Sequence, residues 1–137
     1  MTNTPADPSR PLTVLICDDN ADIRERLTEL IGREPGLRVI GWAGDGDEVI
    51  AKARELQPDV ITLDLSMQGR NGLDALPDVV RAAPTAKTIV VSAYASPTVV
   101  KEAMRRGAAG YIAKGTTMVA ELLLLIGSPC SIAAGSV

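Results

Sequence analysis

The stretch VITLDLSMQGRNG, residues 60–72, determines how the rest of the chain is interpreted. Its apolar residues Val60, Ile61 and Leu63 predict a strand that is buried on both faces. The strand carries one carboxylate, Asp64, at its C-terminal end, and a loop of small and polar residues follows. Ligands of open parallel sheets gather beyond the carboxyl ends of the strands, so Asp64 is placed for chemistry rather than for packing.

Four further strands are predicted around this central one, with amphipathic helices between them. Apolar runs place these strands at 12–17, 37–43, 88–93 and 110–113. Helical spacing of aliphatic residues places helices at 21–34, 45–56, 72–83 and 97–106, and a last helix that ends near residue 126. Strands that alternate with helices through short connections imply right-handed crossovers. We therefore expect an α/β fold with a doubly wound five-stranded parallel sheet, covered by helices on both faces.

Some helix ends leave alternatives open. Either Asp19 or Asn20 caps the first helix, and either Thr116 or Thr117 caps the last one. The third helix contains Pro77, which lacks the backbone N–H that a helix interior requires. This predicts either a kink in the helix or a late start with Asp74 as its cap.

The length of 137 residues fits one domain. Composition predicts a disordered segment at 1–11, a folded domain at 12–126 and a flexible tail or linker stub at 127–137. The two cysteines, Cys17 and Cys130, suggest neither a disulfide framework nor a zinc site. Because a signal peptide and a long apolar run are also missing, we expect a cytoplasmic protein that does not enter a membrane.

The charged and titratable residues exclude several classes of function. Net charge is -3, and no pair of basic helices follows residue 126, so direct contact with nucleic acid is not expected. The chain contains no histidine. This excludes Ser-His-Asp and Cys-His catalysis and histidine metal ligands, and leaves carboxylates, hydroxyls and amines for chemistry.

Polar residues follow four of the predicted strands, at the ends that a parallel sheet brings to one edge. They are Asp18, Asp19, Asp64, Ser92 and Lys114. Taken singly, the acids are typical helix caps, the lysine is typical of solvated surface and the serine is typical of a turn. Together they predict an acidic pocket, and converging carboxylates favour a hard divalent cation.

The pocket chemistry points to phosphoryl transfer with magnesium, or manganese as the alternative ion. The expected metal ligands are Asp19, Asp64 and the backbone carbonyl of Ser66, with Asp18 acting through water. Lys114 supplies a positive charge and Ser92 a hydroxyl donor for phosphoryl oxygens. Asp64 is then the nucleophile that forms an aspartyl phosphate.

These residues resemble a known family. The pattern consists of Asp18-Asp19, Asp64, Ser92-Ala93, Gly107-Ala108 and Gly110-Tyr111 leading to Lys114. Over residues 12–126 it is similar to the receiver domain of bacterial two-component response regulators. The resemblance implies the flavodoxin-like strand order 2-1-3-4-5. It also implies that Asp64 accepts a phosphoryl group from a sensor histidine kinase, with Ser92 and Tyr111 as switch residues and Lys114 pairing with the phosphate.

Two positions depart from that family. Gln68 and Gly115 stand where the family usually has proline. A cis peptide bond before a glycine is unfavourable in free energy. We therefore expect the loop after Lys114 to be trans or unusually mobile. A residue other than proline at position 115 is similar to receivers that precede helix-turn-helix output domains.

Two other functions remain open at this point. A phosphorylation-independent interaction scaffold is favoured by Gln68 and Gly115. A magnesium-dependent aspartyl-phosphate phosphatase would need a second acid two residues beyond its nucleophile, where Ser66 stands. The leading interpretation is not an enzyme but a phosphoacceptor signalling domain, which catalyses at most its own phosphorylation and dephosphorylation.

The last helix predicts a contact surface. Residues 122–126 are all aliphatic, and successive helical residues are about 100° apart, so they cannot all face the core. We expect homodimerisation or docking through the helix at 97–106 and this last helix, with disorder of the chain end as the alternative. Phosphorylation is expected to draw Ser92 toward the phosphoryl oxygens and turn Tyr111 inward, which changes this surface.

Overall fold

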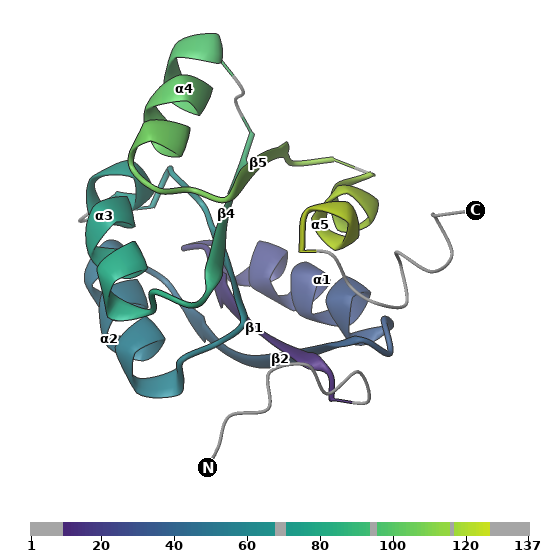
Figure 1. Cartoon of the computed structure of the whole chain (residues 1–137). Helices are drawn as coiled ribbons and strands as arrows, with labels where there is room; N and C mark the ends of the chain where they lie inside the picture. Colours follow the sequence, from purple (N-terminus) through teal and green to yellow (C-terminus); the bar gives the residue numbers. More distant parts are fainter. Residues whose placement is uncertain (1–9, 68–70, 94–95, 116, 127–137) are drawn as a thin grey trace.

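Buried aliphatic strands alternate with helices throughout the part of the chain that the computed structural model describes, residues 10–67, 71–93, 96–115 and 117–126 (Figure 1). The strands are β1 (Leu12–Cys17), β2 (Leu37–Ala43), β3 (Val60–Leu63), β4 (Lys87–Ser92) and β5 (Gly110–Ala113). All neighbouring strands pair in parallel, in the order β2-β1-β3-β4-β5. The expected sheet and its order are therefore confirmed.

Helices cover both faces of the sheet. They are α1 (Ala21–Gly32), α2 (Gly46–Leu56), α3 (Gly72–Ala82), α4 (Pro97–Arg105) and α5 (Met118–Ile126). The helices α1 and α5 lie on one face, and α2, α3 and α4 lie on the other (Figure 1). Alternate residues of β1 accordingly enter different cores: Val14 packs with α1 and α5, and Leu15 packs with α2 and α3.

Side-chain caps fix where the helices begin. Asn20, not Asp19, caps α1, because its side chain accepts a hydrogen bond from the amide of Ile23. Asp45 caps α2 instead of forming its first turn. Of the two alternatives for α5, Thr116 lies outside the described residues, and the hydroxyl of Thr117 donates to Glu121 Oε2 at 2.9 Å.

Several element ends differ from the prediction by one or two residues, among them the end of α1 and both ends of β4. The first helix ends at Gly32 because the amides of Arg33 and Glu34 turn back to the carbonyls of Leu30 and Ile31, 3.4 and 3.0 Å away. The strand β4 begins at Lys87 and ends at Ser92, one residue earlier than expected. The predicted segments at 1–11 and 127–137 fall almost wholly outside the described residues, so that division of the chain stays a prediction.

Of the two alternatives for the third helix, a kink or a late start capped by Asp74, the late start is wrong. Asn71 is the cap, since its Oδ1 accepts from the amide of Asp74 at 2.9 Å, and the helix runs from Gly72 through Pro77. Pro77 cannot donate to the carbonyl of Leu73, four residues earlier. That carbonyl accepts instead from Arg106 Nη1 at 2.9 Å. A residue beyond α4 thus compensates for the proline.

The aliphatic run of α5 divides between core and surface. Leu122 and Ile126 are buried, whereas Leu124 is 70% exposed and Leu125 is 38% exposed. This follows from the helical period and confirms that the run does not face the core entirely.

The hydroxyl of Thr88 is a buried polar group without a hydrogen-bond partner among the described residues. A buried, unpaired hydroxyl is less favourable than a methyl group of the same shape. We therefore expect Thr88→Val to raise the free energy of unfolding by about 1 kcal/mol in urea titrations. Thr13→Val is the matched control, and it should lose stability because its hydroxyl donates to Asp59 Oδ2 at 3.1 Å. Equal losses in the two variants would contradict this prediction.

Candidate functional site

The sheet register brings two carboxylates to one point. Cys17 and Leu63 are paired in β1 and β3, so the next residues, Asp18 and Asp64, leave adjacent strands side by side. Both are buried, at 2% and 4% exposure, and Asp19 beside them is exposed. One carboxylate oxygen from each of the three acids lies within 4.8 Å of the others.

Lys114 completes this cluster from the end of β5. Its Nζ lies 2.8 Å from Asp18 Oδ2 and 3.5 Å from Asp64 Oδ1. The amide of Lys114 donates to the carbonyl of Ser92 at 2.9 Å, which ties the end of β5 to the end of β4. The structure therefore brings together the acids, the lysine and the β4 end that the sequence placed at one edge.

Backbone amides orient the two buried carboxylates. Asp18 Oδ1 accepts from the amide of Asn20 at 2.9 Å, and Asp64 Oδ1 accepts from the amide of Ser66 at 3.2 Å. The carbonyl of Asp18 accepts from Arg24 Nη1 at 2.8 Å. These contacts fix the direction in which both carboxylates point. The role of the Ser66 carbonyl as a metal ligand stays a prediction.

Burial raises the pKa of Asp64 above its ordinary value. The hydrogen bond from the Ser66 amide opposes this rise in pKa, the negative charge of Asp18 adds to it, and Lys114 opposes it. A carboxylate that resists ionisation beside two other acids is stabilised in its charged form by a bound cation. The oxygen-rich cluster fits a hard ion such as Mg²⁺.

This raised pKa predicts how stability depends on pH. The folded chain binds the Asp64 proton more tightly than the unfolded chain does. The stability contributed by the neutral carboxyl is therefore fully present below the unfolded pKa, about 4, and is lost as pH rises through the folded pKa. In buffer with a chelator, we expect Asp64→Asn to be more stable than wild type near pH 7, with the difference vanishing below about pH 4.

Urea unfolding at a series of pH values measures this difference. Glu25→Gln, which removes an exposed carboxylate from α1, is the control and should show no such pH-dependent gap. A wild type that is more stable than Asp64→Asn near neutral pH would contradict the prediction.

The predicted switch residues lie on the neighbouring strands β4 and β5. Ser92 is buried at the end of β4, and Tyr111 is half-buried on β5, where it packs against the core beneath α2, α3 and α4. Their movement on phosphorylation stays a prediction. The described residues contain no cis peptide bond, so Gly115 follows Lys114 in trans as expected. Gln68 lies outside the described residues.

Two residues of the site were not found from the sequence. Arg24 reaches the Asp18 carbonyl from α1, and only its place in the helix after the acid pair could have indicated this. Gly72 packs against the backbone of Asp64, because a Cβ added there would overlap the Asp64 carbonyl oxygen. The signal for Gly72 is a glycine at the start of the helix that follows the loop after Asp64.

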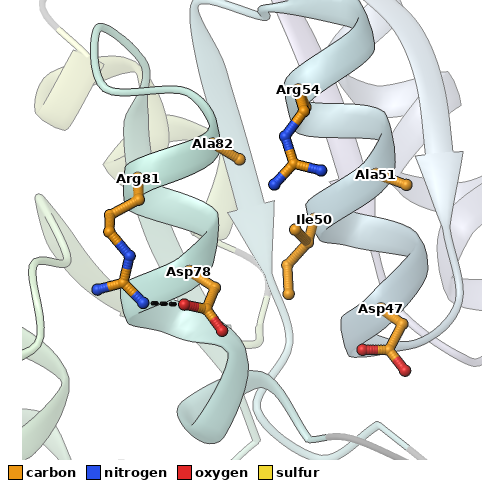
Figure 2. A pocket seen from close by; sticks show the side chains of 7 residues that line it. All are labelled: Asp47, Ile50, Ala51, Arg54, Asp78, Arg81 and Ala82. Atoms are coloured by element: carbon orange, nitrogen blue, oxygen red, sulfur yellow. Dashed lines mark hydrogen bonds and ion pairs between the residues drawn. The ribbon is translucent and has the colours of Figure 1, made fainter.

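A groove of about 370 Å³ between α2 and α3 is separate from this cluster. Figure 2 shows Ile50 and Ala82 between its charged residues, with Arg81 paired with Asp78. None of its lining residues belongs to the predicted site. We assign no chemistry to this groove.

Comparison with protein families shows to which family the chain with this acid cluster belongs. The family model described as the response regulator receiver domain matches residues 14–125. This chain belongs to the receiver domain family. Receiver domains are signalling modules of two-component systems, and transcription regulators are among the relatives of this chain, such as YxjL of Bacillus subtilis at 34% identity over 105 residues.

Individual relatives agree with this assignment. CheY of Thermotoga maritima is 41% identical over 101 residues, which cover 74% of this receiver and 83% of CheY. The protein-glutamate methylesterase of the same organism is 41% identical over 107 residues, 77% of this chain and 31% of that protein. GacA of Pseudomonas aeruginosa is 36% identical over 104 residues, 76% of this chain and 49% of GacA. The chain thus spans a third to a half of the methylesterase and of GacA.

Solved structures show the same fold. The response regulator domain of Thermotoga maritima CheB has a TM-score of 0.77 and 35% identity, over 86% of this chain and 95% of that one. CheY in a CheX–CheY–BeF3–Mg complex from Borrelia burgdorferi has a TM-score of 0.80 and 28% identity, over 90% of this chain and 92% of that one. No helix among the described residues of the receiver has the length and apolar character needed to span a membrane.

Proposed function

We propose that this receiver accepts a phosphoryl group from a sensor histidine kinase on Asp64, in a reaction that requires magnesium. The observation that carries the proposal is the meeting of Asp18, Asp19 and Asp64 within 4.8 Å, with Lys114 Nζ 3.5 Å from Asp64 Oδ1. The scaffold alternative gives no reason for buried acids to converge.

Asp64 is the nucleophile in this proposal. One of its carboxylate oxygens attacks phosphorus, the new O–P bond forms as the P–N bond to the kinase histidine breaks, and the imidazole nitrogen keeps the electron pair. Mg²⁺ or Mn²⁺, when bound, would supply positive charge for the phosphoryl oxygens. Asp19 and Asp64 would hold that ion, with Asp18 acting through water. Lys114, freed from Asp18, would pair with a phosphoryl oxygen.

We propose that phosphorylation changes the surface formed by α4, β5 and α5. In this proposal, Ser92 at the end of β4 would donate its hydroxyl to the phosphoryl group, and Tyr111, on the strand that follows α4, would turn inward. The exposure of Leu124 and Leu125 supports self-association through this surface. Sedimentation of the chain with and without a phosphoryl analogue measures it, and a monomer under both conditions would rule self-association out.

Intact-mass measurement tests the proposed reaction. The chain is incubated with acetyl phosphate and Mg²⁺, and in parallel with acetyl phosphate and a chelator. A mass increase of one phosphoryl group in the first sample alone supports the proposal. No increase in either sample would favour the phosphorylation-independent scaffold, and turnover of a small phosphomonoester would favour the phosphatase. The cytoplasmic location stays a prediction.

A further inference from the structure

Pro77 leaves one carbonyl of α3 without its helical partner. It is the sixth residue of a helix that begins at Gly72, so it lies too late to occupy the first turn, where proline is tolerated. The missing N–H would have bonded to Leu73, and the proline ring also crowds that carbonyl. The carbonyl of Leu73 therefore needs a donor from outside α3.

Arg106, the residue that follows α4, supplies this donor. Its Nη1 donates to the Leu73 oxygen at 2.9 Å, and its Nε donates to Glu102 Oε2 at 2.5 Å. The same Nη1 lies 3.9 Å from Oδ1 of Asp74, whose side chain is 66% exposed, so this ion pair adds little. The arginine side chain is 28% exposed, so water competes only in part for these contacts. A charged donor to a carbonyl is a stronger bond than a neutral one.

The helix α4 has few other attachments to the body of the domain. Ala103 is its only buried residue along the whole of Pro97–Arg105, all of which is described. Figure 1 shows α4 beside the N-terminal end of α3, in agreement with the contact between Arg106 and Leu73. The end of α4 nearer Arg106 is thus held, while its other end is joined to Ser92 through the connection after β4.

We infer that Pro77 and Arg106 act as a pair that fixes the C-terminal end of α4 to α3. When α4 rearranges, the movement therefore takes place at its N-terminal end, which follows Ser92 in the chain. The attachment of the C-terminal end of α4 is inferred only from contacts in the unphosphorylated chain. The direction of the rearrangement rests on the proposed function.

A double-mutant cycle on the chelator-treated, unphosphorylated chain tests the pair. The variants are Arg106→Gln and Pro77→Ala, alone and together, with Arg105→Gln as matched control. Arg105 is the residue before Arg106 and also donates to Glu102, at 2.6 Å, so its replacement by glutamine removes the same charge. Urea unfolding and hydrogen exchange of the α4 amides are the readouts.

We expect Arg106→Gln to raise the unfolding equilibrium constant about tenfold or more and to speed exchange near the C-terminal end of α4. Arg105→Gln should change both little. In the Pro77→Ala background, Arg106→Gln should have a clearly smaller effect than in wild type, because the substituted alanine restores the backbone N–H that bonds to the Leu73 carbonyl. Among the described residues, only the weak ion pair of Arg106 with Asp74 then still joins this arginine to α3. Equal effects of Arg106→Gln in both backgrounds would overturn the pairing.

Arg106→Lys covers the case in which Arg106→Gln does not fold. A lysine has a single ammonium group and cannot reach Glu102 and Leu73 with the fork of an arginine. It should show a smaller rise in the unfolding constant that Pro77→Ala again removes. None of these readouts needs phosphorylation, so their failure leaves the proposed function untouched.

Beryllofluoride with Mg²⁺ tests the direction of the movement. In wild type, the change in amide exchange should be confined to the N-terminal half of α4. A change spread evenly along α4 would overturn the fixed end. A chain that shows no change with beryllofluoride but retains the coupling between Pro77 and Arg106 would refute the proposed switching and leave the pair in place.

Discussion

Asp64→Asn is expected to abolish the phosphoryl mass increase that we propose for the wild-type chain with acetyl phosphate and Mg²⁺. The amide has the size and shape of the carboxylate, but it lacks the anionic oxygen that attacks phosphorus. Among the described residues, no other acid of the cluster has the same surroundings, since Asp18 is already paired with Lys114 at 2.8 Å and Asp19 is exposed. Intact mass and a time course of incorporation measure the effect.

Asp22→Asn is the control for this substitution. It removes a carboxylate from the first turn of α1, near the acid pair in sequence but exposed to solvent. It should accept the phosphoryl group at the wild-type rate. Incorporation by Asp64→Asn at a similar rate would move the acceptor role to Asp18 or Asp19 and would refute the assignment of Asp64.

The sheet and the position of the site could be predicted because both are set by local patterns. Turn residues mark the boundaries of elements: Pro35-Gly36 predicts the end of the first helix, and Ser96-Pro97 predicts the start of the fourth. The aliphatic runs between such boundaries are of strand length. Once all strands are parallel, their carboxyl ends share one edge. Asp64 and Lys114 therefore met at the predicted place, although they are far apart in the chain.

The distances within the site could not be predicted in the same way. The sequence predicted that Lys114 lies near the acids, but not that it is closer to Asp18, at 2.8 Å, than to Asp64, at 3.5 Å. Strand pairing sets where a residue leaves the sheet, whereas the contact also depends on side-chain torsions and on backbone amides such as that of Ser66.

Local sequence patterns also do not reveal that a residue from one helix can replace a hydrogen bond missing in another. From the sequence, Pro77 predicted a helix that lacks one hydrogen bond. A late start capped by Asp74 was one possible solution, but it used only residues that are close in the chain, and it is wrong. The donor that replaces the missing N–H is Arg106, which follows the C-terminal end of α4. A basic residue at a helix end is ordinary in sequence, so only the packing of α4 against α3 reveals its role.

Gly72→Ala should impair both the fold and the site. A Cβ at this position would overlap the carbonyl oxygen of Asp64 and lie 2.9 Å from Leu65 Cα. Both obstacles are backbone, so no side chain can rotate away to make room. The start of α3 or the Asp64 peptide has to move, and that displaces the acceptor carboxylate from the acid pair. We expect a loss of about 1–3 kcal/mol in the free energy of unfolding, and little or no phosphoryl incorporation.

Gly32→Ala is the matched control, because it also adds one methyl group to a glycine in a helix. Nothing lies within 4 Å of a Cβ at Gly32, and alanine favours the helix, so this variant should be as stable as wild type or more stable by up to about 1 kcal/mol. Urea unfolding and the mass assay compare the two variants. If Gly72→Ala matched Gly32→Ala in both measurements, the close approach of α3 to Asp64 would not be what positions the acceptor.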